Sequence, residues 1–234
     1  MISENASDAS SQTPDLDEGL SRREQNVQKR REEILKCAAD IIVTEGVDAL
    51  TLSKVAKMAN VTVPTVHNLY GKKQDIYNHL VDRVSNWMTE QVTENSADRL
   101  LDQMEAGSDR LKCRLEKNEL FFKAGFLVGE RVGHFGRSDK PYQKASKFTI
   151  KKYEAFIKNG DLEGTLNPER MAKFLNDNFR VLRSDWVRGE LSLDDFIWQM
   201  KWCLYVTLMA DATPTFKRVL NKRLDELRAR AGKL

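Results

Sequence analysis

Apolar residues recur with a helical period along most of the chain. Between residues 26 and 44 a stripe is formed by Ile34, Ala38, Ile41 and Ile42. The spacing i, i+4, i+7, i+8 predicts a helix with one buried face. Gly46 follows at the position where glycine commonly ends a helix. This first helix is expected to form the scaffold for the segment that comes next.

Two shorter patterns meet across a turn between residues 52 and 76. The first pattern has apolar positions at i, i+3, i+4 and i+7, namely Leu52, Val55, Ala56 and Ala59. Thr51 precedes it as a natural N-cap. Asn60 then interrupts the pattern, and asparagine tolerates the left-handed backbone that a tight turn needs. We therefore predict a short helix that starts after Thr51 and ends in a turn at Asn60.

The second short helix is predicted to start at Thr62, another N-cap candidate, with Pro64 in its first turn, where the missing N–H costs little. Val61, Val66 and Leu69 are predicted to face inward. That leaves small and polar residues for the outer face and its rim: Thr62, Val63, Pro64, Thr65, His67 and Asn68. A short helix with such an outer face suits the major groove of DNA.

These residues resemble the DNA-binding domain of the tetracycline-repressor (TetR) family. The matching positions are Glu45-Gly46, Thr51 with Val55-Ala56, Ala59 with Val61-Thr62, and Thr65-Val66 followed by Tyr70-Gly71, Lys73 and Ile76. Four residues depart from the usual pattern: Asn60 in place of glycine, Pro64 in place of a small residue, and His67 and Leu69 in place of aromatics. The resemblance implies an N-terminal three-helix, helix-turn-helix DNA-binding domain.

On this interpretation the outer residues of the second short helix read DNA. The residues expected to face base edges are Thr62, Val63, Thr65, His67 and Asn68. Those expected to contact phosphates are Thr51, Ser53, Tyr70, Lys72 and Lys73. The N-terminus of the next helix, near Lys73, could add its N–H groups to a phosphate contact.

The rest of the chain is predicted to be helical as well, so the fold class is all-α. A stripe from Ile76 to Val92 predicts a helix over 73–93. Five or six more helices are expected after residue 97, with breaks near Gly107, 133–136, 160–167 and 189–191. Asn167-Pro168-Glu169 is a helix start, and Ser192 with Asp195 resembles a capping box.

Aromatic residues in this second part allow two interpretations. Aromatics at helical spacing more often belong to a core than to a ligand site. A regulator nevertheless needs an input, so a pocket for a small apolar or aromatic effector is expected among Trp87, Phe121, Phe122, Phe126, Phe148, Phe156 and Phe174.

The segment 192–210 is apolar almost all the way round, so it is either central in the fold or covered by a partner subunit. The family resemblance implies the second: two late helices of each subunit, here 168–188 and 192–210, would form a four-helix dimer interface. The aromatic residues expected there are Trp186, Trp198, Trp202 and Tyr205.

Composition and charge narrow the function. Hydrophobic residues make up 41% of the chain, enough for a sizeable core, and the net charge of +3 is too small to identify a nucleic-acid binder by itself. The acidic first twenty residues predict disorder. The basic run from Arg22 to Arg31 is either an arm beside DNA or a solvated helix start. No secretion signal precedes it, and the most apolar run, 196–209, is too short to span a bilayer, so a cytoplasmic protein is expected.

The sequence contains no motif that indicates a cofactor, a metal site or an enzyme active site. Cys37, Cys113 and Cys203 lack the spacing of a disulfide framework or zinc site, and buried or incidental thiols are favoured over a redox sensor. His67, His79 and His134 show no catalytic or metal-binding spacing. An enzyme is therefore not expected.

We accordingly predict a homodimeric, sequence-specific transcriptional regulator, a repressor released from a palindromic operator by a small molecule. The domains would be an acidic tail (1–21), the DNA-binding domain (22–75) and a C-terminal helical ligand-binding and dimerisation domain (76–234). Two alternatives stay open. The DNA-binding domain could be controlled by a protein partner or be constitutive, or the helical unit could be a protein-interaction module.

Overall fold

The structure is a computed structural model that describes residues 21–90, 100–136 and 138–231. The expected acidic tail therefore lies outside the described residues, except for Ser21. The helices are α1 (Arg22–Glu45), η1 (Val47–Ala49), α2 (Leu52–Met58), α3 (Val63–Tyr70), α4 (Lys73–Glu90), α5 (Leu100–Arg131), α6 (Lys140–Lys158), α7 (Pro168–Arg188), α8 (Leu193–Met209) and α9 (Pro214–Ala231). Within the described part the β structure is limited to one isolated bridge, Leu162 to Ala212. The all-α prediction is confirmed.

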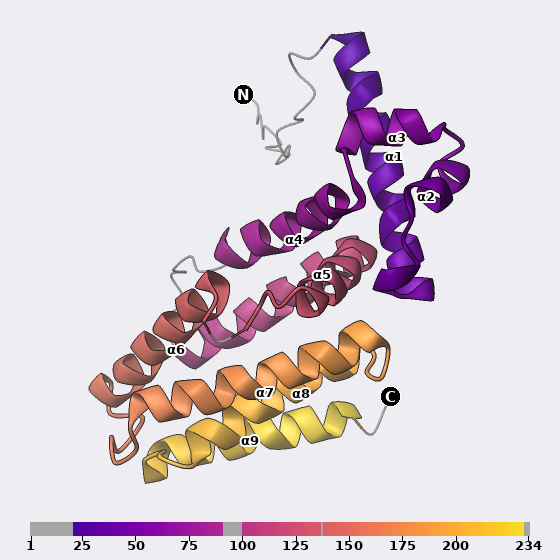
Figure 1. Ribbon diagram of the computed structural model, residues 1–234. Coiled ribbons are helices and arrows are strands. Elements are labelled where there is room, and N and C mark those ends of the chain that lie inside the picture. The colour runs from indigo at the N-terminus through magenta and orange to yellow at the C-terminus, as the bar shows by residue number, and fades with distance from the viewer. Residues whose placement is uncertain (1–20, 91–99, 137, 232–234) are drawn as a thin grey trace, which may run out of the picture.

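Helices α1 to α3 form a compact head at one end of the molecule, and α4 leads from it onto the stacked helices α5 to α9 (Figure 1). Helix α1 begins four residues earlier than its apolar stripe predicts. The reason is a capping box: the Glu24 N–H donates to the Ser21 hydroxyl at 3.3 Å, and the Ser21 N–H donates to the Glu24 carboxylate at 2.8 Å. The cap fixes a polar first turn that buries nothing.

The turn between α2 and α3 agrees with the local signals in the sequence. Thr51 caps α2 by accepting a hydrogen bond from the Lys54 N–H, and Thr62 caps α3 by accepting one from the Thr65 N–H. Asn60 has a φ of 51°, the left-handed conformation predicted for it. Because these signals act over three or four residues, the sequence alone was sufficient to place both helices.

The predicted break at Gly107 is wrong. Helix α5 runs through Gly107, and the non-helical backbone lies instead at Asn118, with φ −139° and ψ 26°. A single glycine costs a helix only about 1 kcal/mol, which packing on both sides easily offsets. The other predicted breaks coincide with the turns between α5 and α6, α6 and α7, and α7 and α8.

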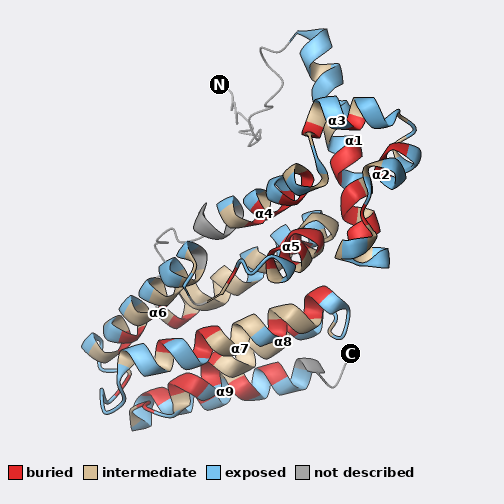
Figure 2. Cartoon of the chain, in the orientation of Figure 1, coloured by how far each residue is buried: buried red, intermediate tan, exposed pale blue. Residues whose placement is uncertain are grey.

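Burial is concentrated along the lines where the helices meet (Figure 2). One apolar cluster is continuous from Ile34 of α1 through Leu80 of α4 and Phe126 of α5 to Trp186 of α7. A second cluster is formed by side chains of α6, α7, α8 and α9, together with Leu101 of α5. The head therefore shares its core with the helices behind it, and α1 packs directly against both α4 and α5.

Helix α8 occupies an inner position in this stack, since it packs against α5, α7 and α9. Its buried side chains include Phe196, Leu204 and Leu208, whereas Val206 is exposed. Part of its all-round apolar character is thus explained within one chain. No helix in the described ranges is both long and apolar enough to cross a membrane.

Candidate functional site

The outer face of α3 is exposed to solvent. Val66 is fully buried against α1 and α2, which turns Val63, His67 and Asn68 towards solvent. Thr62 is exposed and Thr65 half-buried, and their hydroxyl oxygens lie 2.9 Å apart. The structure therefore brings all five residues predicted to face base edges onto one exposed face and its rim.

The residues predicted to contact phosphates are at least partly exposed, with one exception. Thr51, Ser53 and Lys72 are exposed, and Lys73 is half-buried. The Lys73 ammonium group lies 3.4 Å from the carbonyl oxygen of Asp48 and 5.3 Å from the centre of the Tyr77 ring.

Tyr70 is the exception, because its side chain points into the head. Only 9% of Tyr70 is exposed, and its hydroxyl donates a hydrogen bond to the carbonyl oxygen of Arg31 at 2.8 Å. In return the Arg31 guanidinium donates to the carbonyl oxygen of Leu69 at 2.8 Å. Tyr70 thus fixes the angle between α3 and α1. Sequence reasoning missed this brace because its partners lie almost forty residues apart.

The N-terminus of α4 already holds an acidic side chain. The Asp75 carboxylate accepts a hydrogen bond from the Lys72 N–H at 2.7 Å and lies beside Gly71, which has a φ of 84°. A carboxylate at this place satisfies a free N–H group and the helix dipole. Any phosphate at this helix end would therefore meet Asp75 as well as Lys72.

A cavity of about 820 Å³ lies behind the head, bounded mainly by α5, α6, α7 and α8. Of the seven residues predicted for an effector pocket, Phe126 and Phe148 line this cavity. The structure does not place the others there. Phe122 and Phe156 are buried in the apolar clusters, Phe121 lies under the Arg83 guanidinium, and Phe174 is 59% exposed. The side chain of Trp87 is outside the described part.

Several residues that line the cavity were not predicted. They include the aromatic residues Phe135, Phe179, Trp186 and Phe196 and the polar residues Thr149, Asn176, Arg180 and Arg183. A signal for part of this set was present, because Asn176, Arg180 and Arg183 follow at i, i+4 and i+7 and share one face of α7. Polar residues on the buried face of a helix indicate a lined cavity more directly than aromatics do.

The end of α5 connects the cavity wall with the head. Glu130 lies 3.7 Å from the Arg183 guanidinium, and its neighbour Arg131 lies 3.4 Å from the Asp48 carboxylate, just before α2. Nearby, the Tyr77 hydroxyl of α4 donates to the carbonyl oxygen of Val47 at 2.5 Å. Helices α5 and α4 therefore both contact the η1 segment that precedes α2.

The aromatic residues predicted for a dimer interface lie mostly inside the protomer. Trp186 is fully buried and stacks on Phe196, and Tyr205 is 3% exposed. Trp202 stacks on Trp198, whose indole N–H donates to the Leu227 carbonyl of α9. Three other apolar side chains of α7 and α8 are instead exposed: Phe174, Val181 and Val206.

Comparison with known proteins agrees with this arrangement. Residues 34–80 match the family described as "Bacterial regulatory proteins, tetR family". No curated protein sequence matches the chain. These matched residues contain α2, α3 and the first half of α4.

Solved structures match nearly the whole chain. A gamma-butyrolactone receptor (ArpA-like protein) is 14% identical, with 88% of this chain and 99% of that chain covered and a TM-score of 0.64. The TetR family protein CprB from S. coelicolor A3(2) is 16% identical, with 86% and 98% covered and a TM-score of 0.63. SmeT, the repressor of the Stenotrophomonas maltophilia multidrug efflux pump SmeDEF, is 19% identical, with 81% and 93% covered and a TM-score of 0.59.

At these identities the structural likeness establishes the fold, and the family match covers the helices that form the reading head. Residues 34–80, which include α2 and α3, therefore match the tetR family of bacterial regulatory proteins, and the chain as a whole has the fold of the solved TetR-family structures.

Proposed function

We propose that the chain is a homodimeric, sequence-specific repressor whose affinity for its operator is lowered by a small molecule bound in the α5–α8 cavity. The observation that supports this most strongly is the combination of an exposed reading face on α3 with a large cavity that shares a core with it. A cavity of about 820 Å³ has the size of a small-molecule binding site.

In this proposal α3 enters the major groove. Thr62, Val63, Thr65, His67 and Asn68 face base edges, while Thr51, Ser53, Lys72 and Lys73 hold phosphates. Asn68 can pair with adenine through two hydrogen bonds, and Val63 can contact a thymine methyl group. The residues 22–75 act as the DNA-binding domain, and 76–234 receive the effector and the partner subunit.

The exposed apolar side chains of α7 and α8 support a dimer that forms through these helices. Phe174 and Val181 are one heptad apart on α7, and both are more than half exposed. A twofold axis through this surface would present two α3 helices to successive major grooves, about 34 Å apart, on a palindromic operator.

The relatives support both halves of the proposal. SmeT is a repressor and has been solved as a complex with triclosan, and the ArpA-like protein is a receptor for gamma-butyrolactones. Ligand binding would act by population shift: the effector binds more tightly to an arrangement of α4 and α5 that holds the reading helices at the wrong spacing.

Selection of bound duplexes from a random DNA pool tests the proposal directly. The expected product is a palindromic site with two half-sites about one helical turn apart. A small-molecule library is then screened for release of that site and for a rise in Tm. Duplexes without a shared sequence would contradict the reader. A selected site that no small molecule releases would favour a constitutive regulator or a protein partner.

A further inference from the structure

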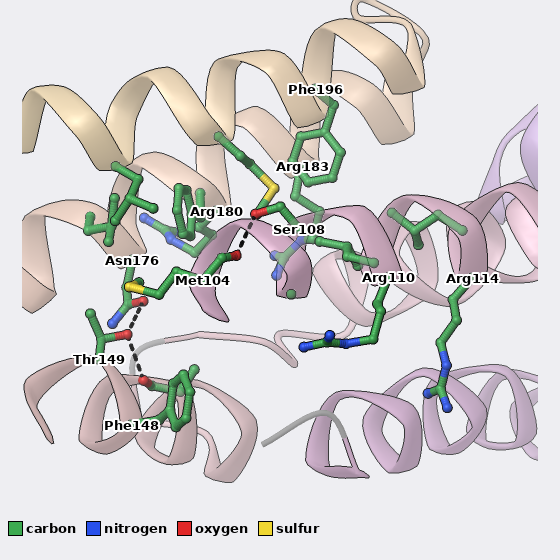
Figure 3. A pocket seen from close by; sticks show the side chains of 18 of the residues that line it. Met104, Ser108, Arg110, Arg114, Phe148, Thr149, Asn176, Arg180, Arg183 and Phe196 are labelled. Atoms are coloured by element: carbon green, nitrogen blue, oxygen red, sulfur yellow. Dashed lines mark hydrogen bonds between the residues drawn. The ribbon is translucent and has the colours of Figure 1, made fainter. Parts of the chain in front are cut away.

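The cavity carries more positive than negative charge. Five of its lining residues are cationic, whereas Asp109 is its one acidic residue within the described part of the chain. The Asp109 carboxylate is already paired with the Lys201 ammonium group at 2.6 Å. The cationic residues include Arg180 and Arg183, which project into the cavity from one face of α7 (Figure 3).

The Arg183 side chain is largely buried, with 13% of its surface exposed. Its guanidinium lies 4.6 Å from the centre of the Phe126 ring and 5.6 Å from that of Phe135. Burial lowers the pKa of Arg183 to about 10, and the neighbouring Arg180 acts in the same direction while Glu130 opposes it. Because this pKa lies far above neutrality, Arg183 keeps its charge inside an apolar wall.

The charge of this arginine pair is only partly compensated. Glu130 approaches Arg183 no closer than 3.7 Å, lies 3.8 Å from Arg188 and accepts a hydrogen bond from the Ser184 hydroxyl. One carboxylate thus serves two arginines and a serine. The buried Nε atoms of Arg180 and Arg183 have no hydrogen-bond partner among the described residues.

Neutral donors extend the same surface. The Asn176 side chain accepts a hydrogen bond from the Thr149 hydroxyl through its oxygen, at 3.2 Å, and its buried amide nitrogen has no partner in the described ranges. Asn176 precedes Arg180 by one helical turn, so its amide and the two guanidinium groups face the same space. Buried donors in a polar, roomy cavity indicate a ligand that accepts hydrogen bonds.

The rest of the wall is apolar. Phe126, Phe135, Phe148 and Phe179 line the cavity together with Met200 and Leu204. A small inorganic anion would leave this surface uncovered, and a neutral apolar molecule would leave the charge of the two arginines only partly compensated.

We propose that the effector is an amphipathic organic anion: its carboxylate or other acidic group binds Arg180 and Arg183, with Asn176 donating beside them, and its aromatic or aliphatic body lies among the phenylalanines. This inference rests on the proposed function for the role of the cavity as an effector site. It changes the expectation of an apolar or aromatic effector by adding a required negative charge.

Two fluorescent probes with the same skeleton test the charge requirement. 1-Anilinonaphthalene-8-sulfonate carries a sulfonate, and N-phenyl-1-naphthylamine lacks it. Titration of the full chain should give saturable binding of both probes, with the anion bound about tenfold or more tightly, since hydrogen bonds to buried charges are the strong ones. Equal affinity for the two probes would overturn the inference.

Substitutions of Arg180 and Arg183 test whether these two residues cause the preference for the anionic probe. Arg183→Met and Arg180→Met should each reduce the preference for the anion about tenfold while leaving the affinity for the neutral probe unchanged, which also shows that the cavity is folded. Arg188→Met is the matched control, because Arg188 contacts the same Glu130 but is 57% exposed and does not line the cavity. A preference for the anion that survives both cavity substitutions would overturn the inference.

The failure of this inference can be distinguished from the failure of the proposed function. Probe binding is measured without DNA, whereas selection from the random DNA pool is done without probe. Loss of the charge preference with an operator still selected would leave the regulator intact and refute the anionic effector. A strong charge preference with no selected operator would refute the regulator and retain an anion-binding cavity.

Discussion

Gly125 of α5 lies so close to Leu80 of α4 that a methyl group at Gly125 would come within 2.7 Å of the Leu80 carbonyl oxygen. The same methyl group would lie 2.5 Å from a methyl of Val84. The glycine therefore sets the separation of α4 and α5, the two helices that connect the cavity with the reading head.

Gly125→Ala should lower the free energy of unfolding by about 1–3 kcal/mol, because the clash with backbone cannot be relieved by a rotamer change. For a chain of this size 1 kcal/mol corresponds to about 2–4 °C in Tm, which thermal unfolding can resolve. Gly107→Ala, elsewhere in α5, is the control. A Cβ there meets nothing closer than 3.8 Å, so this change should raise stability by about 0.5–1 kcal/mol. Equal stability of the two variants would refute the close approach.

Tyr70→Phe should destabilise the packing of α3 on α1 without changing the salt dependence of DNA binding. Removing the hydroxyl deletes the bond to the Arg31 carbonyl, at a cost of about 0.5–1.5 kcal/mol. Lys72→Ala, by contrast, should reduce the slope of log affinity against log salt by about one. Operator titrations at several salt concentrations compare the two variants. A smaller slope for Tyr70→Phe would indicate that the Tyr70 hydroxyl does contact a phosphate.

Stability at alkaline pH should also depend on Tyr70. Burial, aided by Glu32 and opposed by Arg31 and Arg83, raises the pKa of Tyr70 from 10 to about 12. A folded-state pKa above the unfolded value stabilises the protein fully below pH 10, and this contribution is lost as the pH rises towards 12. Urea unfolding of the unaltered chain should therefore show a steeper loss over this range than that of Tyr70→Phe. Parallel curves would contradict the assignment.

The accuracy of sequence-based prediction here depends on how local each signal is. Thr51, Asn60 and Thr62 act within one turn, and the reading helices follow from them. The effector residues depend on which helices pack together, information that a single sequence does not contain. Phe122 and Phe126 are four residues apart on α5 and are buried in the same apolar cluster, yet only Phe126 also lines the cavity. The hydrogen bonds that join Arg31 of α1 to Leu69 and Tyr70 of α3 could not be predicted for the same reason.

Val181→Asp should convert the proposed dimer into a folded monomer. Val181 is 55% exposed, so the charge costs the isolated protomer little, but it cannot be buried unpaired in an interface. Light scattering should give half the mass of the unaltered protein, with unchanged circular dichroism. Val132→Asp, at an exposed valine in the turn after α5, is the control and should remain dimeric. A Val181→Asp dimer would exclude this face of α7 from the interface.

Asn68→Ala should separate sequence reading from general affinity for DNA. Asn68 is exposed on α3, and its side chain has no hydrogen bond within the described residues, so it is available to a base edge. Loss of a bidentate contact with adenine should cost about 1–3 kcal/mol on the selected operator and little on random duplex. Lys72→Ala should instead weaken both duplexes alike, because phosphates carry no sequence information. Equal losses from Asn68→Ala on the two duplexes would show that α3 lies on DNA without reading it at this position.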